Sequence, residues 1–208
     1  MPFDINSLES LLPPELSAQK KDRLKESLKQ FLKENQNKAK YYTDFYSNEN
    51  YPYFLQGDVI REIRFPVFNF GTGEYEKEYF DVILISNTCD MDEANTRKVK
   101  KNVIIAKLIP FDNFIEALKE LRVEKADDII IQVQNQLYSN LFYLPPNYHG
   151  VEYIVYLDEL SWITISELKD LKEDMQENRI ASLDFYGYYL FVLKLSYHLC
   201  LLPEETHR

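Results

Sequence analysis

Three apolar segments decide how this chain folds: Gln56-Gly-Asp-Val-Ile60, Asp81-Val-Ile-Leu-Ile-Ser-Asn87 and Asn102-Val-Ile-Ile-Ala-Lys-Leu-Ile-Pro110. Each is rich in Val, Ile and Leu, which favour β-strands. Gly71-Thr-Gly73 lies between the first two segments, where its glycines permit a hairpin turn. This order predicts a mainly antiparallel, strongly curved sheet over residues 51–165.

The middle of this sheet is expected to be buried on both faces. Residues 82–85 and 103–105 are continuous apolar runs. Such runs are typical of strands that are covered on both sides. We therefore expect Val82, Leu84 and Ile104 to be core residues.

Further elements are predicted downstream. Residues 141–144 and 153–157 are expected to pair around a turn rich in proline, and residues 162–165 to add a last short strand. Residues 127–138 allow two interpretations. The segment has the pattern of a helix, but Ile129-Ile-Ile-Gln-Val133 is also good strand sequence.

Helices are predicted at both ends of the chain. Ser17 can cap an amphipathic helix. Its apolar positions recur at helical spacing and include Leu24, Leu28 and Phe31. Ser182 can cap a helix over residues 183–201, which is apolar or aromatic around nearly its whole circumference. That helix is either buried against the sheet or left partly uncovered as a binding surface.

Composition limits the classes of protein to which the chain belongs. It has 208 residues and a formal net charge of −10, which opposes a general attraction to nucleic acid. Cys89 and Cys200 show no disulfide or metal spacing, and no targeting segment is recognised, so a cytoplasmic location is expected. We predict one compact domain in three regions. These are an arm and helix over residues 1–50, a β-barrel with inserted helices over 51–165, and packed helices over 166–208.

The order of the three apolar segments resembles the barrel core of the MazF/PemK toxin family. In that family a Gly-Asp-Ile/Val start leads into the first long strand, and a hairpin loop that reaches over the RNA follows. The resemblance implies an α+β fold, an SH3-like antiparallel β-barrel with helical additions at both ends. The family's catalytic residues are not matched here. Phe80-Asp81 stands where Arg-Pro is expected, and the catalytic Thr position falls near Ile109.

Nuclease chemistry needs a proton acceptor and a cation near the phosphate. The candidates are Arg61, Arg64 and Ser86, of which Ser86 aligns with the serine at the end of the family's Leu-Ser strand. No residue is assigned a catalytic role. Cys89 has Asp90, Asp92 and Glu93 beside it, which disfavour a thiolate, so we expect a buried structural cysteine. No metal, cofactor or glycine-rich phosphate loop is predicted.

Two functions remain from the sequence. The first is a non-catalytic MazF-like binding protein, similar to the MazF-like anti-sigma subunits that accompany CRISPR-associated Lon proteases. It would hold a protein partner, such as a sigma factor, a protease or an antitoxin-like protein, in a stress or antiviral circuit. The second is a metal-independent endoribonuclease toxin that binds RNA. The protein-binding candidates are Tyr189, Phe191, Leu24, Leu28 and Phe31. A homodimer is possible, and no membrane association is expected.

Overall fold

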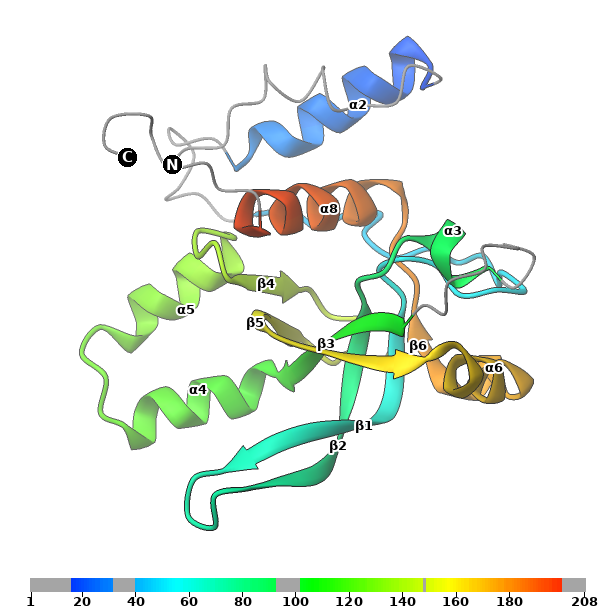
Figure 1. The fold of residues 1–208 in the computed structure, drawn as a ribbon. Coiled ribbons are helices and arrows are strands. Elements are labelled where there is room, and N and C mark those ends of the chain that lie inside the picture. Colours follow the sequence, from blue (N-terminus) through cyan, green and yellow to red (C-terminus); the bar gives the residue numbers. More distant parts are fainter. Residues whose placement is uncertain (1–15, 32–39, 93–101, 148, 200–208) are drawn as a thin grey trace, which may run out of the picture.

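The computed structural model describes residues 16–31, 40–92, 102–147 and 149–199. It is an α+β protein built on one antiparallel sheet (Figure 1). Along the sheet the six strands follow the order β4-β5-β3-β2-β1-β6. The strands are β1 (Val59–Asn69), β2 (Glu74–Leu84), β3 (Asn102–Pro110), β4 (Leu141–Leu144), β5 (Tyr153–Thr164) and β6 (Arg179–Ala181).

The sheet is open. Its outer strands are β4 and β6, and in the described part of the chain these two strands do not pair with each other. The antiparallel sheet expected from the sequence is therefore confirmed, but a closed barrel is not.

Helices lie on both sides of the sheet. They are α2 (Ala18–Lys29), α3 (Thr88–Met91), α4 (Phe111–Glu120), α5 (Ala126–Gln134), α6 (Ile165–Glu173), α7 (Met175–Asn178) and α8 (Phe185–Leu199). Ser17 caps α2 as predicted, since its side chain accepts a hydrogen bond from the backbone N–H of Lys20. Thr164 and Glu167 form a reciprocal capping box that begins α6 directly at the end of β5.

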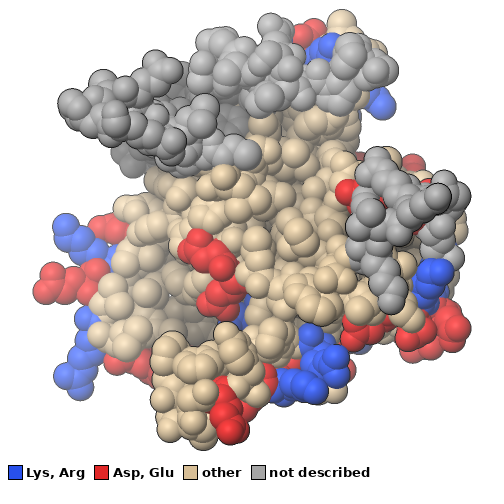
Figure 2. All heavy atoms as spheres, viewed as in Figure 1, with Lys and Arg blue, Asp and Glu red and all other residues tan. Residues whose placement is uncertain are grey.

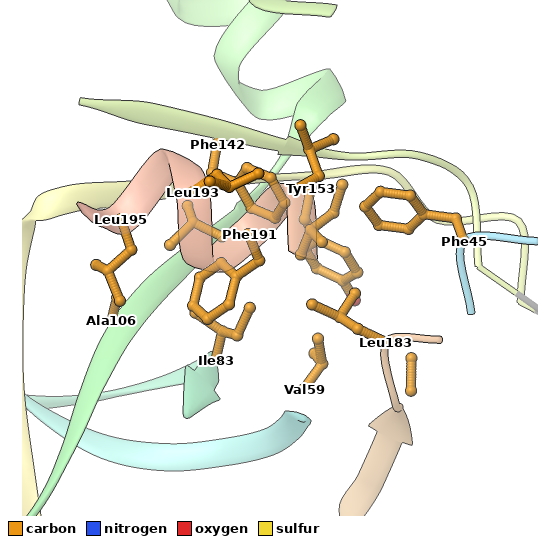
Figure 3. Packing of buried hydrophobic residues seen from close by; sticks show 14 of the residues in the cluster. Phe45, Val59, Ile83, Ala106, Phe142, Tyr153, Leu183, Phe191, Leu193 and Leu195 are labelled. Carbon is orange, nitrogen blue, oxygen red and sulfur yellow. The ribbon is translucent and has the colours of Figure 1, made fainter. Parts of the chain in front are cut away.

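One face of the sheet packs against α8, which in turn lies beside α2 (Figure 1). Phe191 of α8 is fully buried between Phe142 and the central strands (Figure 3). Leu24 and Leu28 of α2 belong to the same core cluster. The two terminal helices are therefore part of the main core.

The opposite face carries two separate apolar clusters. One contains Val82 and Leu84 and is covered in part by Leu168 of α6. The other contains Phe111 and Tyr143 and lies near α4 and α5. Because Ile83 points to the first face and Val82 to the second, the central strands are buried on both sides, as their continuous apolar runs predict.

Several expectations from the sequence need correction. Ile104 is 42% exposed, because its side chain lies on the face of the sheet that α8 covers, but outside the packed cluster. Residues 162–165 do not form a separate strand, since β5 runs without interruption from Tyr153 to Thr164. The ambiguous segment is a helix, α5. The last helix begins at Phe185, because Ser182 accepts a backbone hydrogen bond from Ser47 and so belongs to an extended segment.

A buried ion pair joins the start of β1 to β6. The carboxylate of Asp58 is fully buried and accepts a hydrogen bond from Arg179 at 3.2 Å. Arg179 also donates to the carbonyl of Tyr53 at 3.0 Å and to Asn50 at 3.1 Å. Burial raises the pKa of Asp58 above its ordinary value, and the pair with Arg179 opposes that effect. The pair fixes the segment before β1 against the sheet edge.

Alanine substitutions at Leu84 and Ile104 should reduce stability by different amounts. Leu84→Ala is expected to lower the free energy of unfolding by ~2–4 kcal/mol, because it leaves a cavity in a region covered on both faces. Ile104→Ala should cost less than about 1 kcal/mol, since that side chain is already 42% exposed. Urea denaturation of both variants measures the difference. Equal losses would contradict the assignment of these faces.

Lys194 on α8 makes stability depend on pH. It is only 6% exposed and donates a hydrogen bond to the carbonyl of Gln136. Burial lowers its pKa from 10.5 to about 7. Between these two values the unfolded chain binds more protons than the folded one, so this residue makes stability rise with pH from 7 upward.

Lys194→Met isolates that effect. The stability of the wild type relative to the variant should increase by about 1 kcal/mol per pH unit above pH 7, measured by urea denaturation at several pH values. At pH 7 and below the variant should be the more stable protein, because a methionine avoids the cost of a buried charge. Parallel pH profiles for the two proteins would show that Lys194 is not desolvated in the folded state.

Candidate protein-binding site

The hairpin of β1 and β2 extends beyond the rest of the sheet. β2 pairs with β3 only at Val82, Ile83 and Leu84, and β1 pairs with β6 only at Val59 and Ile60. In the described chain, residues 63–69 and 74–80 therefore pair only with each other. This two-stranded ribbon projects from the body of the protein at the bottom of Figure 1. We call it the β1–β2 ribbon.

The register gives the ribbon two chemically different faces. Arg64 lies opposite Tyr79, Pro66 opposite Lys77, and Phe68 opposite Tyr75. Paired residues share one face of a sheet. We call this set the aromatic face, which consists of Arg64, Pro66, Phe68, Tyr75, Lys77 and Tyr79.

The aromatic face is open to solvent. Tyr75 is 75% exposed and Tyr79 69% exposed, and Phe70 in the turn beside them is 91% exposed. The Phe68 ring contacts both Tyr75 and Phe70, with centroids 5.2 Å and 5.0 Å away. Figure 2 shows the end of the ribbon, at the bottom of the view, largely as uncharged surface with carboxylates at one side.

The other face carries the acidic residues. On β2 these are Glu74, Glu76 and Glu78, and all three are exposed. On β1 the same face carries Phe65, which is buried against the ring of Phe80. This packing joins the base of the ribbon to the core cluster under α6. An isolated hairpin is marginally stable, so this contact is what keeps the ribbon extended.

A β-bulge sets the root of the ribbon. Arg61 and Glu62 together oppose Asp81, and Glu62 adopts a left-handed backbone conformation with φ of 50°. One carboxylate oxygen of Asp81 accepts the N–H of Glu62 at 3.1 Å, and the other accepts the Tyr153 hydroxyl at 2.9 Å. Burial and the adjacent Asp81 raise the pKa of Tyr153, whereas the charge of Arg61 opposes the increase.

The aromatic face is a continuation of the sheet face that α8 covers. Along β2, Ile83 lies in the core beside α8, Asp81 lies at the bulge, and Tyr79 follows on the same face. The cover ends where the bulge begins. The sequence places aromatic residues beyond that point, where strands that only face water usually carry polar ones.

The three nuclease candidates have different neighbours. Arg64 pairs with Glu167 of α6 at 3.3 Å. Ser86 accepts the backbone N–H of Ile104 at 2.8 Å, and so continues the pairing of β2 with β3. Arg61 lies at the bulge near Tyr153. Arg64 thus belongs to the ribbon and Arg61 lies at its root, whereas Ser86 lies just beyond the other end of β2.

Four of the five predicted protein-binding residues are buried within the protein itself. Leu24, Leu28 and Phe31 of the first helical segment pack into the main core, and Phe191 is fully buried. Their apolar surface is used inside the fold, so the prediction that they anchor a partner needs correction. Tyr189 is half-buried and its ring packs against Phe185 at 4.9 Å.

Cys89 also differs from expectation, because it is exposed. It lies at a pocket of about 360 Å³ between α3 and α6, with an apolar floor formed by Phe54, Met91 and Leu168. The side chain of Asn87 caps α3 and accepts the backbone N–H of Cys89. In the described residues no group of His, Cys, Asp and Glu side chains is arranged to hold a metal ion.

Comparison with known proteins gives no further assignment: no family model matches the chain, and no curated protein matches its sequence. Among the helices that the structure describes, none has the length and apolar character needed to cross a membrane.

The sequence contains a signal for the two faces of the ribbon. In Glu74-Tyr-Glu-Lys-Glu-Tyr79 every second residue is glutamate, which indicates a strand with one acidic face. The opposite face follows from the same alternation. What the sequence does not contain is the end of the cover by α8, which determines that these tyrosines are exposed.

Substitution on the two faces should affect stability very differently. Tyr79→Ser is expected to change the free energy of unfolding by less than about 1 kcal/mol, because its ring is 69% exposed. Phe65→Ala should lose ~3–5 kcal/mol, since Phe65 is buried in the cluster under α6. Chemical denaturation of both variants tests this. A large loss in Tyr79→Ser would mean that the aromatic face is covered in solution.

Proposed function

We propose that this chain is a non-catalytic, MazF/PemK-like binding protein. In this proposal the open sheet is a relative of the family's SH3-like barrel, and the protein holds a protein partner in a cytoplasmic stress or antiviral circuit. The partner is a sigma factor, a protease or an antitoxin-like protein. The binding site is the aromatic face of the β1–β2 ribbon.

The observation that carries this proposal is the exposure of Phe68, Phe70, Tyr75 and Tyr79 together on one projecting element. Aromatic side chains supply most of the energy at protein interfaces, and arginine often accompanies them. Arg64 lies on the same face. Four exposed aromatic residues grouped on one projecting element are typical of a surface that binds another protein.

The contacts that the nuclease candidates already make within the protein favour binding over catalysis. Ser86 already accepts a backbone hydrogen bond, and Arg64 is paired with Glu167. A catalytic base and a cation close to one phosphate are needed for attack by a 2′-hydroxyl group. These side chains have separate surroundings.

An endoribonuclease is the second candidate. Arg61 lies at the root of the ribbon, and Arg64 and Lys77 lie on its aromatic face, where exposed rings can stack on bases. The net charge of −10 weighs against it, because phosphate binding gains most of its free energy from basic residues.

Site-specific crosslinking tests the proposed function. A photoreactive phenylalanine analogue is placed at Tyr79 in the full chain, in cells that naturally make the protein. We expect one protein to be crosslinked at Tyr79, and Phe68→Ser with Tyr75→Ser in the same chain to reduce the yield at least tenfold. The analogue at Tyr41, which is 76% exposed but lies on a different segment, is the matched control.

The nuclease alternative is tested with purified protein and by the identity of the molecule crosslinked at Tyr79. Purified protein should leave single-stranded RNA intact, with or without divalent metal. Cleavage that disappears in Arg61→Ala, or RNA as the crosslinked partner at Tyr79, would favour the nuclease instead.

A further inference from the structure

The outer edge of β2 is an unpaired strand edge. Leu84 accepts the N–H of Gly57 and donates its own N–H to Asp58, so the backbone groups of Leu84 point toward β1. Backbone direction alternates along a strand. The backbone N–H and C=O groups of Tyr75, Lys77 and Tyr79 therefore point away from β1. Pro66, opposite Lys77, agrees with this register, because a proline is tolerated where the N–H would face outward.

No strand of the described chain covers this edge, because β3 leaves β2 after the pair Val82–Lys107. Edges of this kind bind extended peptides as an additional strand. We propose that the outer edge of β2 binds an extended segment of the partner that carries Lys or Arg at alternate positions. This inference rests on the proposed function and adds the mode of binding and the chemistry of the partner.

The negative charge of the acidic face favours a basic partner strand at this edge. A strand added to β2 places its residues directly opposite Glu74, Glu76 and Glu78 on the acidic face. Directly opposed charges of opposite sign stabilise an antiparallel pair, and like charges destabilise it. The intervening residues of the partner lie against Tyr75, Lys77 and Tyr79. The partner segment therefore alternates basic residues with apolar or aromatic ones.

A second copy of this chain fits the edge poorly. Two edges pair through residues whose backbone groups face outward, so Tyr75, Lys77 and Tyr79 of one copy would pair with the same set in another. In the register of fullest overlap, which pairs Lys77 with Lys77, Glu76 of each copy lies opposite Glu78 of the other. The edge of β1 is no better, because Pro66 removes a donor at its centre and Phe65 and Val67 would face the glutamates.

A designed peptide tests the inference without knowledge of the natural partner. The probe is a fluorescein-labelled peptide of about nine residues that alternates Lys and Val, titrated with the full chain and followed by fluorescence anisotropy at low salt. The control peptide has the same composition with its lysines and valines in two blocks. We expect the alternating peptide to bind roughly tenfold more tightly, because only its register matches the acidic face.

Two variants separate backbone pairing from charge. Lys77→Pro removes an outward N–H from the centre of the edge and should abolish binding of the peptide with an unchanged melting temperature. Glu76→Lys with Glu78→Lys should weaken binding roughly tenfold. Glu116→Lys with Glu120→Lys, on exposed positions of α4, makes the same change in net charge and should bind as the wild type does.

Failure of this inference is distinct from failure of the proposed function. Equal affinity for both peptides, or full binding by Lys77→Pro, would overturn strand addition, while crosslinking at Tyr79 would still stand. Single-stranded RNA that displaces the alternating peptide, and whose binding is lost in Lys77→Glu, would overturn strand addition and assign the ribbon to nucleic acid.

Discussion

The pairing of β1 with β2 is the constraint on which the rest of the structure depends. Each strand has 11 residues, and at roughly 3.3 Å per residue a strand of this length spans about 36 Å. The 15 residues of α8 span only about 22 Å at 1.5 Å per residue. Helices therefore cover on both faces only the end of the hairpin that carries Val59 and Leu84, and the remainder must be stable while largely exposed. Phe65 and Phe80 stabilise the exposed part, because their contact extends the apolar cluster under α6 along one face of the ribbon.

The bulge at Glu62 marks the boundary between these two parts. A left-handed conformation at a residue that is not glycine costs about 1 kcal/mol, and the N–H of Glu62 is compensated by the carboxylate of Asp81. The same carboxylate holds the Tyr153 hydroxyl at the margin of the main core. Asp81 thus joins the last covered position of the sheet to the first position of the ribbon. An extra residue in β1 also increases the local twist, which directs the ribbon away from the sheet.

Local sequence patterns predicted the sheet, its hairpin and the burial of Val82 and Leu84 correctly, because continuous apolar runs and turn glycines act over short distances. The predicted closure into a barrel is not confirmed, because closure depends on the distance between β4 and β6, which are far apart in the sequence. The same limit explains Phe191. An apolar helix is compatible with a core or an interface, and only its contact with Phe142 decides between them. For the site, the alternation from Glu74 to Tyr79 predicts two faces but not which of them is covered.

Charge along the ribbon also disfavours pairing of its exposed edge with another copy of the same chain. Exposed strand edges are prone to pair with other copies of the same chain. Here Pro66 interrupts one edge, and the glutamates beside the other repel an identical strand in the register of fullest overlap. These features do not exclude a partner with the opposite charge pattern. The same residues that disfavour pairing of like chains thus define which chain can bind.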